Sequence, residues 1–430
     1  MQPSGFKSLR LGIVLLLALS VGGLSLGAQT GAQRVAAATA PAIGLACTYG
    51  PTFTVDAKTG IITISDGNTV FMWSYSVGGQ PFQYPGPVLC VNQGDTVTVI
   101  FHNTLSEDSS IIFPGQTNVL ANGAPAQPQF DGTGKATSLT NVAPANGGSM
   151  TYSFVASNPG TYLYQSGTNP EKQARMGLSG ALIVRPTSGA NFAYNRADSR
   201  FTPEEEFLVF LTEIDPYQHS AAEQNLPFDL TTYHVHYWLL NGRTFPDTIA
   251  DNFATRLPSQ PYGSLARIHP YDATAHPYPG LARYINAGSE EYSHHPHGHN
   301  GVVIGRDGQP VAGPAGQDMS FEKYAINIGP GQTWDVLMQW YDAENYSMAN
   351  PIPVTVPDIS NMTTGMFYSG SPYLGVKGTL PPGTSSLNQC GEYYIISHNH
   401  ALFQLDAWGM TMAGQITYLR IDPPLPNNCP

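Results

Sequence analysis

Four of the chain's twelve histidines lie within six residues, in the stretch EEYSHHPHGHNG. They are His294, His295, His297 and His299, and a second stretch, SHNH, adds His398 and His400. Imidazoles that converge in space can hold a divalent transition metal such as Cu(II), Ni(II) or Zn(II). The candidate metal ligands are therefore His294, His297, His299, His398 and His400. The alternative is a metal-free cluster of hydrogen-bonded histidines.

The other histidines offer weaker patterns. His295 is expected to be an exposed neighbour of the cluster that points away from His297 in an extended segment. His234 and His236, in YHVHYWLLNG, are expected to form a surface pair before a strand, because no partner ligand is evident. The remaining ones are isolated in the sequence and are expected to be ordinary: His102, His219, His269 and His276.

The composition indicates which elements must position these side chains. The chain has 430 residues, 41% of them hydrophobic, which is enough for two domains with real cores. Only 11% are charged, while 45 are Gly and 36 are Pro, a mixture that favours short strands joined by turns. The fold class is therefore predicted to be all-β. The formal charge of -12 repels phosphate backbones and anionic lipids, so nucleic acid is not an expected partner.

The first residues have the pattern of an export signal. Lys7 and Arg10 precede an apolar run from Leu11 to about Leu26, and small residues follow. Residues 1–28 are expected to be a signal peptide and residues 29–46 a flexible lead-in, so the location is predicted to be secreted, periplasmic or cell surface. The run is near the minimum length for spanning a bilayer, so an uncleaved anchor is the alternative. No later segment is expected to form an integral membrane domain.

Export implies an oxidising compartment, in which cysteines form disulfides. The four cysteines fall two toward each end of the chain. Among the three possible pairings, this placement favours Cys47–Cys90 and Cys390–Cys429. Free-thiol chemistry is then not expected.

Strand-like runs divide the chain into two halves. Residues 47–186 contain runs such as DTVTVIFHN and GALIVRP, separated by turn residues, and residues 187–205 form a polar link. Strand-like runs resume in residues 206–430 with GVVIGRDG, TWDVLMQWY and YYIISHNH. Two β-sandwiches in tandem are therefore predicted. Residues 345–389 are rich in Pro, Gly and Ser and are expected to be a long surface loop or lid.

Several phrases of the sequence resemble the multicopper oxidase superfamily. PGPVLCVNQGDTVTVIFHNTL resembles the opening of its first cupredoxin domain, and GTYLYQSGTNPEKQARMGLSGALIV resembles the end of that domain. LARYINAGSEEYSHHPHGHNGVVIGRDGQPV, INIGPGQTWDVLMQW and YYIISHNHALFQLDAWGMTMAGQITYLRID resemble its copper-bearing last domain. The resemblance implies two cupredoxin-like (plastocyanin-like) Greek-key β-sandwich domains, at 47–186 and 206–430, with copper as the cofactor.

The first of these domains departs from the family pattern of copper ligands. Ile112 and Pro114 stand where the family has a His-x-His pair, and Gln165 and Gly167 stand where it has a second one. Four of the eight imidazoles that such a protein uses to hold three coppers are therefore absent. The resemblance then predicts that a three-copper, oxygen-reducing centre of the usual kind does not form.

The second domain keeps more of the pattern. His294, His297 and His299 reproduce the family's His-x-x-His-x-His spacing, and His398 and His400 reproduce its final pair. Between the members of that pair, Asn399 stands where the family has the cysteine of the type 1 copper site, and Gln404 stands near its next histidine. The resemblance therefore implies five retained ligands without the thiolate that a type 1 site requires.

Together these patterns predict a secreted copper-binding protein with one copper ion per chain in the second domain. Another divalent transition metal is an alternative occupant. The sequence leaves open whether the chain is an enzyme, and predicts at most oxidoreductase activity at a mononuclear copper, without laccase-type reduction of oxygen. The competing hypothesis is a non-catalytic extracellular or cell-surface binding protein on the same scaffold. Two-domain members of the superfamily often form trimers, so the resemblance implies a homotrimer as one possible assembly.

Overall fold

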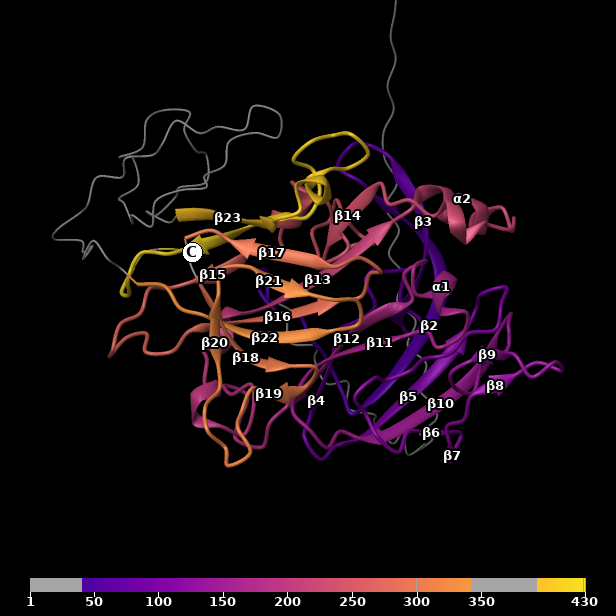
Figure 1. The fold of residues 1–430 in the computed structure, drawn as a ribbon, viewed down its shortest axis with the longest axis horizontal. Helices are drawn as coiled ribbons and strands as arrows, with labels where there is room; N and C mark the ends of the chain where they lie inside the picture. The colour runs from indigo at the N-terminus through magenta and orange to yellow at the C-terminus, as the bar shows by residue number, and fades with distance from the viewer. Residues whose placement is uncertain (1–40, 299, 342–392, 428, 430) are drawn as a thin grey trace, which may run out of the picture. The chain divides into compact units, whose positions relative to one another are not determined.

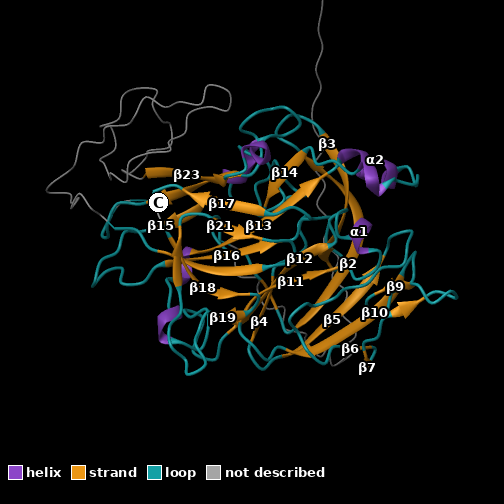
Figure 2. Cartoon of the chain, in the orientation of Figure 1, coloured by secondary structure: helices purple, strands orange, loops and turns teal. Residues whose placement is uncertain are grey.

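The computed structural model describes residues 41–298, 300–341, 393–427 and 429 (Figure 1). Strands dominate these residues, and the helices are short, as Figure 2 shows. The helical elements are α1 (Pro170–Gln173), α2 (Pro216–Glu223), η1 (Ala197–Ser199), η2 (Pro203–Glu205), η3 (Leu230–Thr232), η4 (Asp247–Ile249) and η5 (Leu402–Leu405). The predicted all-β fold class is confirmed. The predicted export signal and the predicted loop at 345–389 lie outside the described residues.

The first half of the chain forms two facing sheets and a small third one. In spatial order, the four-stranded sheet contains β1 (Thr48–Tyr49), β4 (Leu89–Asn92), β12 (Ser179–Arg185) and β11 (Gly160–Gln165). The six-stranded sheet contains β3 (Thr69–Val77), β2 (Thr52–Thr63), β5 (Thr96–Asn103), β10 (Gly148–Val155), β6 (Leu120–Ala121) and β7 (Ala124–Pro125). The two-stranded sheet pairs β8 (Gln129–Phe130) with β9 (Ala136–Ser138).

The second half forms two larger sheets. In spatial order, the seven-stranded sheet contains β14 (Tyr237–Leu240), β13 (Glu206–Ile214), β16 (Gly280–Asn286), β22 (Thr333–Met338), β18 (Gly301–Arg306) and β19 (Gln309–Pro310), with β20 (Phe321–Lys323) also paired to β18. The five-stranded sheet contains β15 (Ala266–Ile268), β24 (Ile416–Ile421), β23 (Tyr393–Asn399), β17 (Tyr292–Pro296) and β21 (Ile326–Ile328).

Alternation of apolar and polar residues explains why these segments become strands with one buried face. In β5, Val97, Val99 and Phe101 are buried while the residues between them are less buried. They share a core with residues of the four-stranded sheet, such as Leu182. The two sheets of the second half enclose a separate core in the same way, for example through Tyr284 and Ile395. Each half is therefore a β-sandwich.

The inner sheets of the two sandwiches pack against each other. Ile183 of the first sandwich shares an apolar cluster with Phe210 and Ile285 of the second. Strands β12, β13 and β16 are consequently buried along most of their length, which explains their near-continuous apolar sequences. This packing makes the four-stranded sheet an inner layer of the molecule.

A network of buried charges also crosses between the sandwiches. Arg283 is fully buried and pairs with both Glu206 and Asp335, and Arg185 donates to both carboxylate oxygens of Glu206 at 2.6 Å. Thr161 of the first sandwich donates to Asp335 at 2.5 Å. Burial raises the pKa of the Glu206 carboxyl, but the two arginines outweigh this effect and hold the pKa below its usual 4.5.

Two further predictions concern the region near the start of the described chain. The Cys47–Cys90 disulfide is present, whereas Cys390 of the second predicted pair lies outside the described residues. The end of the predicted lead-in is held by hydrogen bonds: Leu45 N donates to Glu206 O at 2.8 Å and Asn252 N donates to Ala42 O at 2.7 Å. In the part of the chain that the structure describes, no helix is both long and apolar enough to cross a membrane.

Candidate metal centre

The candidate ligands lie on two neighbouring strands of the five-stranded sheet. Strands β17 and β23 run antiparallel, with His295 opposite His398 and His294 opposite Asn399 (Figure 1). Because side chains alternate across a strand, one face of this pair carries His295, His297, His398 and His400. We call these four residues the histidine face. His294 belongs to the opposite face.

The four rings of the histidine face are close to one another. His297 Nε2 lies 2.9 Å from His398 Nε2. Ring centroids are 4.7 Å apart for His295 and His297, 5.3 Å for His295 and His400, and 5.9 Å for His398 and His400. The structure therefore brings together three of the five predicted ligands, namely His297, His398 and His400. His299 lies outside the described residues.

Backbone carbonyls orient two of these rings. His295 Nδ1 lies 2.6 Å from Tyr324 O, and His398 Nδ1 lies 2.6 Å from Asn399 O. A carbonyl oxygen only accepts hydrogen bonds, so each Nδ1 must carry a proton, and in the neutral imidazole Nε2 then keeps a lone pair. A histidine that ligates a metal characteristically donates its other ring N–H in this way.

Burial lowers the pKa of two of these rings, those of His297 and His398. Burial, reinforced by His398 and the other neighbouring imidazoles, lowers the pKa of His297 to about 4. Burial likewise lowers the pKa of His398. A neutral imidazole can ligate a metal without first losing a proton.

The spacing of the ring nitrogens fits copper. Two neighbouring ligands of a square-planar Cu(II) ion, with bonds of about 2.0 Å, are about 2.8 Å apart, whereas tetrahedral ligands are about 3.3 Å apart. The 2.9 Å between the Nε2 atoms of His297 and His398 is close to the first value. The same distance also suits a hydrogen bond between the two rings, and among the described residues no third ligand atom of the histidine face lies within 4.8 Å of both.

His294, the first predicted ligand, lies in the core instead. Its Nδ1 is 3.1 Å from Tyr284 Oη, its Nε2 is 3.3 Å from Ser397 Oγ, and 1% of the residue is exposed. Burial lowers its pKa to about 3, so it is a neutral, hydrogen-bonded core histidine.

The residues beside His294 do not fit a type 1 copper. The side chain of Asn399 accepts a hydrogen bond from Ser293 N at 2.8 Å and donates one to Gln415. Gln404, near the position of the family's last histidine, donates to Glu290 Oε2 at 3.0 Å. Amides that are already hydrogen-bonded occupy the places where the resemblance implies a thiolate and an imidazole.

The prediction for His295 is wrong. It does not point away from the cluster, since its ring lies 4.7 Å from that of His297. The physical reason is the period of the strand: residues two apart share a face, so His295 and His297 lie together and His294 lies opposite.

Two other pairs of histidines lie in different surroundings, one at the surface and one beside a buried carboxylate. His236 packs against Trp408, with ring centroids 4.8 Å apart, and His234 is exposed beside it, consistent with a surface pair. His269 and His276, expected to be isolated, lie together with Glu205. No local sequence signal links them, because Glu205 is 64 residues before His269 in the chain.

The corresponding region of the first sandwich has no imidazoles. Ile112 and Gln165 form an antiparallel bridge, with Ile112 N donating to Gln165 O at 2.8 Å. Beside it, Ser166 Oγ donates to Gln173 Oε1 at 2.7 Å, and Ser110 and Thr168 hydroxyls are 2.8 Å apart. Hydroxyl and amide groups therefore fill the space near positions where the resemblance implies copper ligands.

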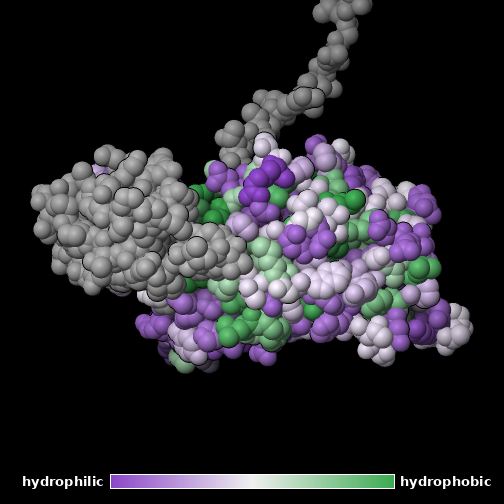
Figure 3. Space-filling view, turned by 90° about the horizontal axis from the view of Figure 1, so that it is seen from above, coloured by the Kyte–Doolittle hydropathy of each residue, from purple (hydrophilic) through white to green (hydrophobic). Residues whose placement is uncertain are grey.

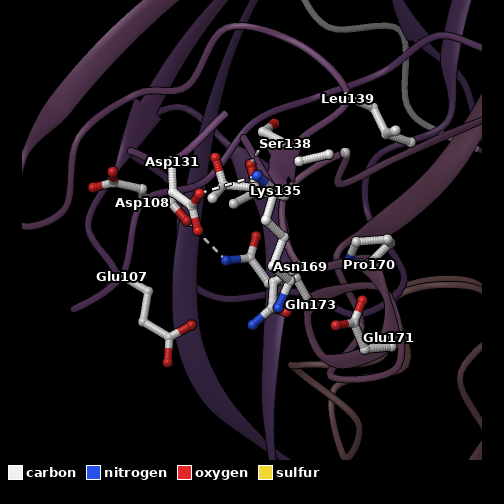
Figure 4. Close-up of a pocket in the computed structure, with 14 residues that line it drawn as sticks. Glu107, Asp108, Asp131, Lys135, Ser138, Leu139, Asn169, Pro170, Glu171 and Gln173 are labelled. Carbon is white, nitrogen blue, oxygen red and sulfur yellow. Dashed lines mark hydrogen bonds between the residues drawn. The ribbon is translucent and has the colours of Figure 1, made fainter. Parts of the chain in front are cut away.

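This region opens into a surface pocket of about 490 Å³. Gly167, Thr168 and Gln173 form part of its wall. Figure 4 shows the carboxylates of Asp108 and Asp131 on one side and Pro170 and Glu171 on the other. It is a surface pocket with a mixed polar and apolar lining rather than a set of convergent metal ligands.

The two sandwiches define a cupredoxin-like fold. Residues 69–189 match the family model described as multicopper oxidase. The fold is similar to that of a blue copper oxidase from Nitrosomonas europaea, with a TM-score of 0.57 and 18% identity over 86% of this chain and 85% of that one. A solved multicopper oxidase, mgLAC, gives the same TM-score, with 19% identity over 86% of each chain.

Relatives with curated descriptions agree. L-ascorbate oxidase of Cucurbita maxima is 36% identical over 107 residues, which are 25% of this chain and 17% of that protein. L-ascorbate oxidase of Brassica rapa subsp. pekinensis is 24% identical over 318 residues, 71% of this chain and 51% of that protein. The chain thus spans only about half or less of these relatives' lengths. Residues 69–189 and the fold are therefore similar to those of multicopper oxidases.

Proposed function

We propose that the chain is a secreted multicopper-oxidase-like protein that binds one copper ion through the histidine face, His295, His297, His398 and His400. The observation that carries this proposal is the 2.9 Å separation of the His297 and His398 Nε2 atoms. The carbonyl-held Nδ1 atoms of His295 and His398 support it, because they leave the Nε2 lone pairs turned to ligation. His299 remains a proposed further ligand, and His294 is not part of the proposed set.

The chain's own residues would hold and orient the ion. Tyr324 O and Asn399 O fix the rings of His295 and His398, and burial keeps His297 neutral. When bound, copper supplies one-electron redox chemistry. The proposed activity is therefore at most an oxidation or reduction at a single copper.

A second candidate function is a non-catalytic extracellular or cell-surface scaffold. The amides at Asn399 and Gln404 favour it, because each makes hydrogen bonds where the family's type 1 ligands would stand. The polar residues in the first sandwich favour it as well. Both candidate functions include three further proposals: export, cleavage after residue 28 and assembly as a homotrimer. N-terminal sequencing and sedimentation of the exported protein test them.

Copper loading followed by metal analysis and electron paramagnetic resonance distinguishes the two candidates. The copper-binding proposal expects one ion per chain with an ordinary tetragonal Cu(II) signal. That ion should be lost in a His297→Ala/His398→Ala double variant. The matched control is His234→Ala/His236→Ala, another pair of neighbouring histidines, which should keep the ion.

Three outcomes would contradict the proposal. An intense absorption band from thiolate-to-copper charge transfer requires a cysteine ligand, which the proposed set does not contain. Retention of the tetragonal signal in the His297→Ala/His398→Ala variant would place the copper elsewhere. If no copper is retained by the wild-type chain, the scaffold function is the one that stands.

A further inference from the structure

Three side chains with metal-binding atoms meet at another place in the second sandwich. Glu205 ends η2, His269 directly follows β15, and His276 lies in the turn that precedes β16. One ligand atom from each lies within 4.8 Å of those of the other two. Glu205 Oε1 is 2.6 Å from His269 Nδ1 and 3.0 Å from His276 Nε2. We call these three residues the carboxylate–histidine cluster.

The charge of Glu205 needs a cation nearby. Only 2% of Glu205 is exposed, and within the described residues its ion pairs are with His269 and His276. The neighbouring Asp422 is different, because Arg267 and Arg420 both pair with it. A buried carboxylate is costly unless it is paired or bound to a metal. The charge of Glu205 is therefore compensated by whichever cation the cluster holds, either a histidinium or a metal ion.

Two buried atoms in the cluster also have hydrogen-bonding capacity left over. Glu205 Oε2 and His276 Nδ1 are buried and find no hydrogen-bond partner among the described residues. His276 is 6% exposed, so both side chains are shielded from solvent. Buried polar atoms usually have a partner. Glu205 Oε2 is therefore available to an ion in the cluster, whereas His276 Nδ1 lies on the other edge of its ring from the Nε2 atom that faces Glu205.

From this geometry we infer that the carboxylate–histidine cluster is a second metal site, which takes one divalent transition metal ion such as Zn(II). Two imidazoles and a carboxylate form a ligand set that suits zinc and related ions of intermediate softness. The inference does not rest on the proposed function of the histidine face.

The cluster is separate from the histidine face along the same sheet. His398 pairs with Ile416 at the start of β24, whereas Asp422, next to His269, follows the end of that strand. The length of β24 is about 17 Å at roughly 3.4 Å per residue, so one ion cannot serve both places.

The carboxylate–histidine cluster joins three segments of the chain, namely the end of η2, the residue after β15 and the turn before β16. His276 closes a short turn, with reciprocal backbone hydrogen bonds to Asp272 of 3.0 Å. Without an ion, His269 Nδ1 donates a proton to Glu205 Oε1 in a hydrogen bond of 2.6 Å. An ion that binds the cluster replaces that proton, which goes to solvent, and anchors the turn to η2 and β15.

The test uses the His297→Ala/His398→Ala chain, in which the histidine face is disabled. After loading with Zn(II) and desalting, metal analysis should find one ion per chain. Adding His276→Ala should remove it, while adding His102→Ala, a histidine beside the single carboxylate Asp56, should not. Zinc bound in the double variant but unaffected by His276→Ala would overturn the inference, as would the absence of zinc from the folded double variant.

A second measurement covers the case in which His276→Ala does not fold. Co(II) added to the His297→Ala/His398→Ala chain should give the absorption of a nitrogen and oxygen site and shift the proton resonances of two imidazoles. Glu205→Gln, which keeps the side-chain size, should lower the affinity for Co(II) at least tenfold. Resonance shifts from fewer than two imidazoles would mean that a histidinium alone neutralises Glu205, which overturns the inference.

Discussion

Each sandwich contains an antiparallel contact between two strands, and the side chains at the two contacts differ. In the first sandwich, Ile112 pairs with Gln165 across an antiparallel bridge. In the second, His295 pairs with His398 across β17 and β23. The backbone contact is similar, but the first is surrounded by hydroxyl and amide groups and the second by imidazoles.

This difference shows that the interactions that stabilise the fold are not the ones that could bind a metal ion. Ladder hydrogen bonds and apolar cores specify each sandwich, and neither requires an imidazole at the strand contact. The face drawn in Figure 3 gives no reason to prefer one sandwich as a binding platform. On the face drawn in Figure 3, apolar residues among those described are scattered between polar ones rather than gathered in one area. Any difference in function should therefore come from a few side chains.

The largest expected effect comes from removing the charge that joins the two sandwiches. Arg283→Met should lower the free energy of unfolding by about 3–5 kcal/mol, because it leaves the buried carboxylates of Glu206 and Asp335 undercompensated. Chemical denaturation measures the loss. Arg256→Met, in an ion pair where the arginine is exposed, should change stability by less than about 1 kcal/mol. Equal losses in the two variants would mean that the network does not join the sandwiches.

A pH effect of nearly the same size is expected at His219, where α2 of the second half packs on β3 of the first. His219 Nδ1 donates to Phe71 O at 2.6 Å. Burial lowers the pKa of His219 from 6.5 to about 4 in the folded chain. Below pH 6.5 the unfolded chain therefore binds the proton more readily, so stability falls as the pH falls from 6.5 to 4, by on the order of 3 kcal/mol.

Urea denaturation across this pH range measures the effect in metal-free protein. His219→Gln should be less stable at neutral pH but should lose less stability on acidification than the wild-type chain. His102→Ala, in which the removed histidine is partly exposed, should keep the wild-type slope. An unchanged slope in His219→Gln would show that the acid sensitivity arises elsewhere.

Most of the fold could be predicted from the sequence because strands leave a local signal. Runs such as DTVTVIFHN and TWDVLMQWY became β5 and β22, since alternation or continuous apolar character follows directly from whether one or both faces are buried. The packing of the polar segment at 187–205 could not be predicted from its composition. It contains Tyr194 and Phe201, which are buried against Leu281 of the second sandwich.

The candidate site could be predicted only in part. His297, His398 and His400 carry a local spacing signal, whereas the division of His294 and His295 between two faces depends on the strand period, and it was assigned wrongly. The carboxylate–histidine cluster left no signal, because tertiary packing alone brings its segments together. Sequence spacing identifies ligands on one strand more readily than ligands from three separate segments.

A smaller effect should come from the amide that occupies the family's cysteine position. Asn399→Ala should destabilise the chain by about 2 kcal/mol, because Ser293 N and Gln415 would each lose a buried partner. Thermal unfolding measures the change. Asn68→Ala, which removes an exposed hydrogen-bonding amide, should cost less than about 0.5 kcal/mol. A neutral Asn399→Ala would mean that the amide only fills space.

The smallest effect, and the most direct test of the comparison, is to give the first sandwich the side chains of the second. Ile112→His/Gln165→His places two imidazoles across the first-sandwich bridge, as His295 and His398 are placed in the second. In a His297→Ala/His398→Ala background, calorimetric titration should show Cu(II) affinity about tenfold higher than without the new pair, or roughly 1.4 kcal/mol. Ile112→Asn/Gln165→Asn is the matched polar control and should show no gain. If the new histidines also give no gain in Cu(II) affinity, the strand contact alone does not make a copper site. The part that the first sandwich lacks is then the pair of carbonyls that orient His295 and His398.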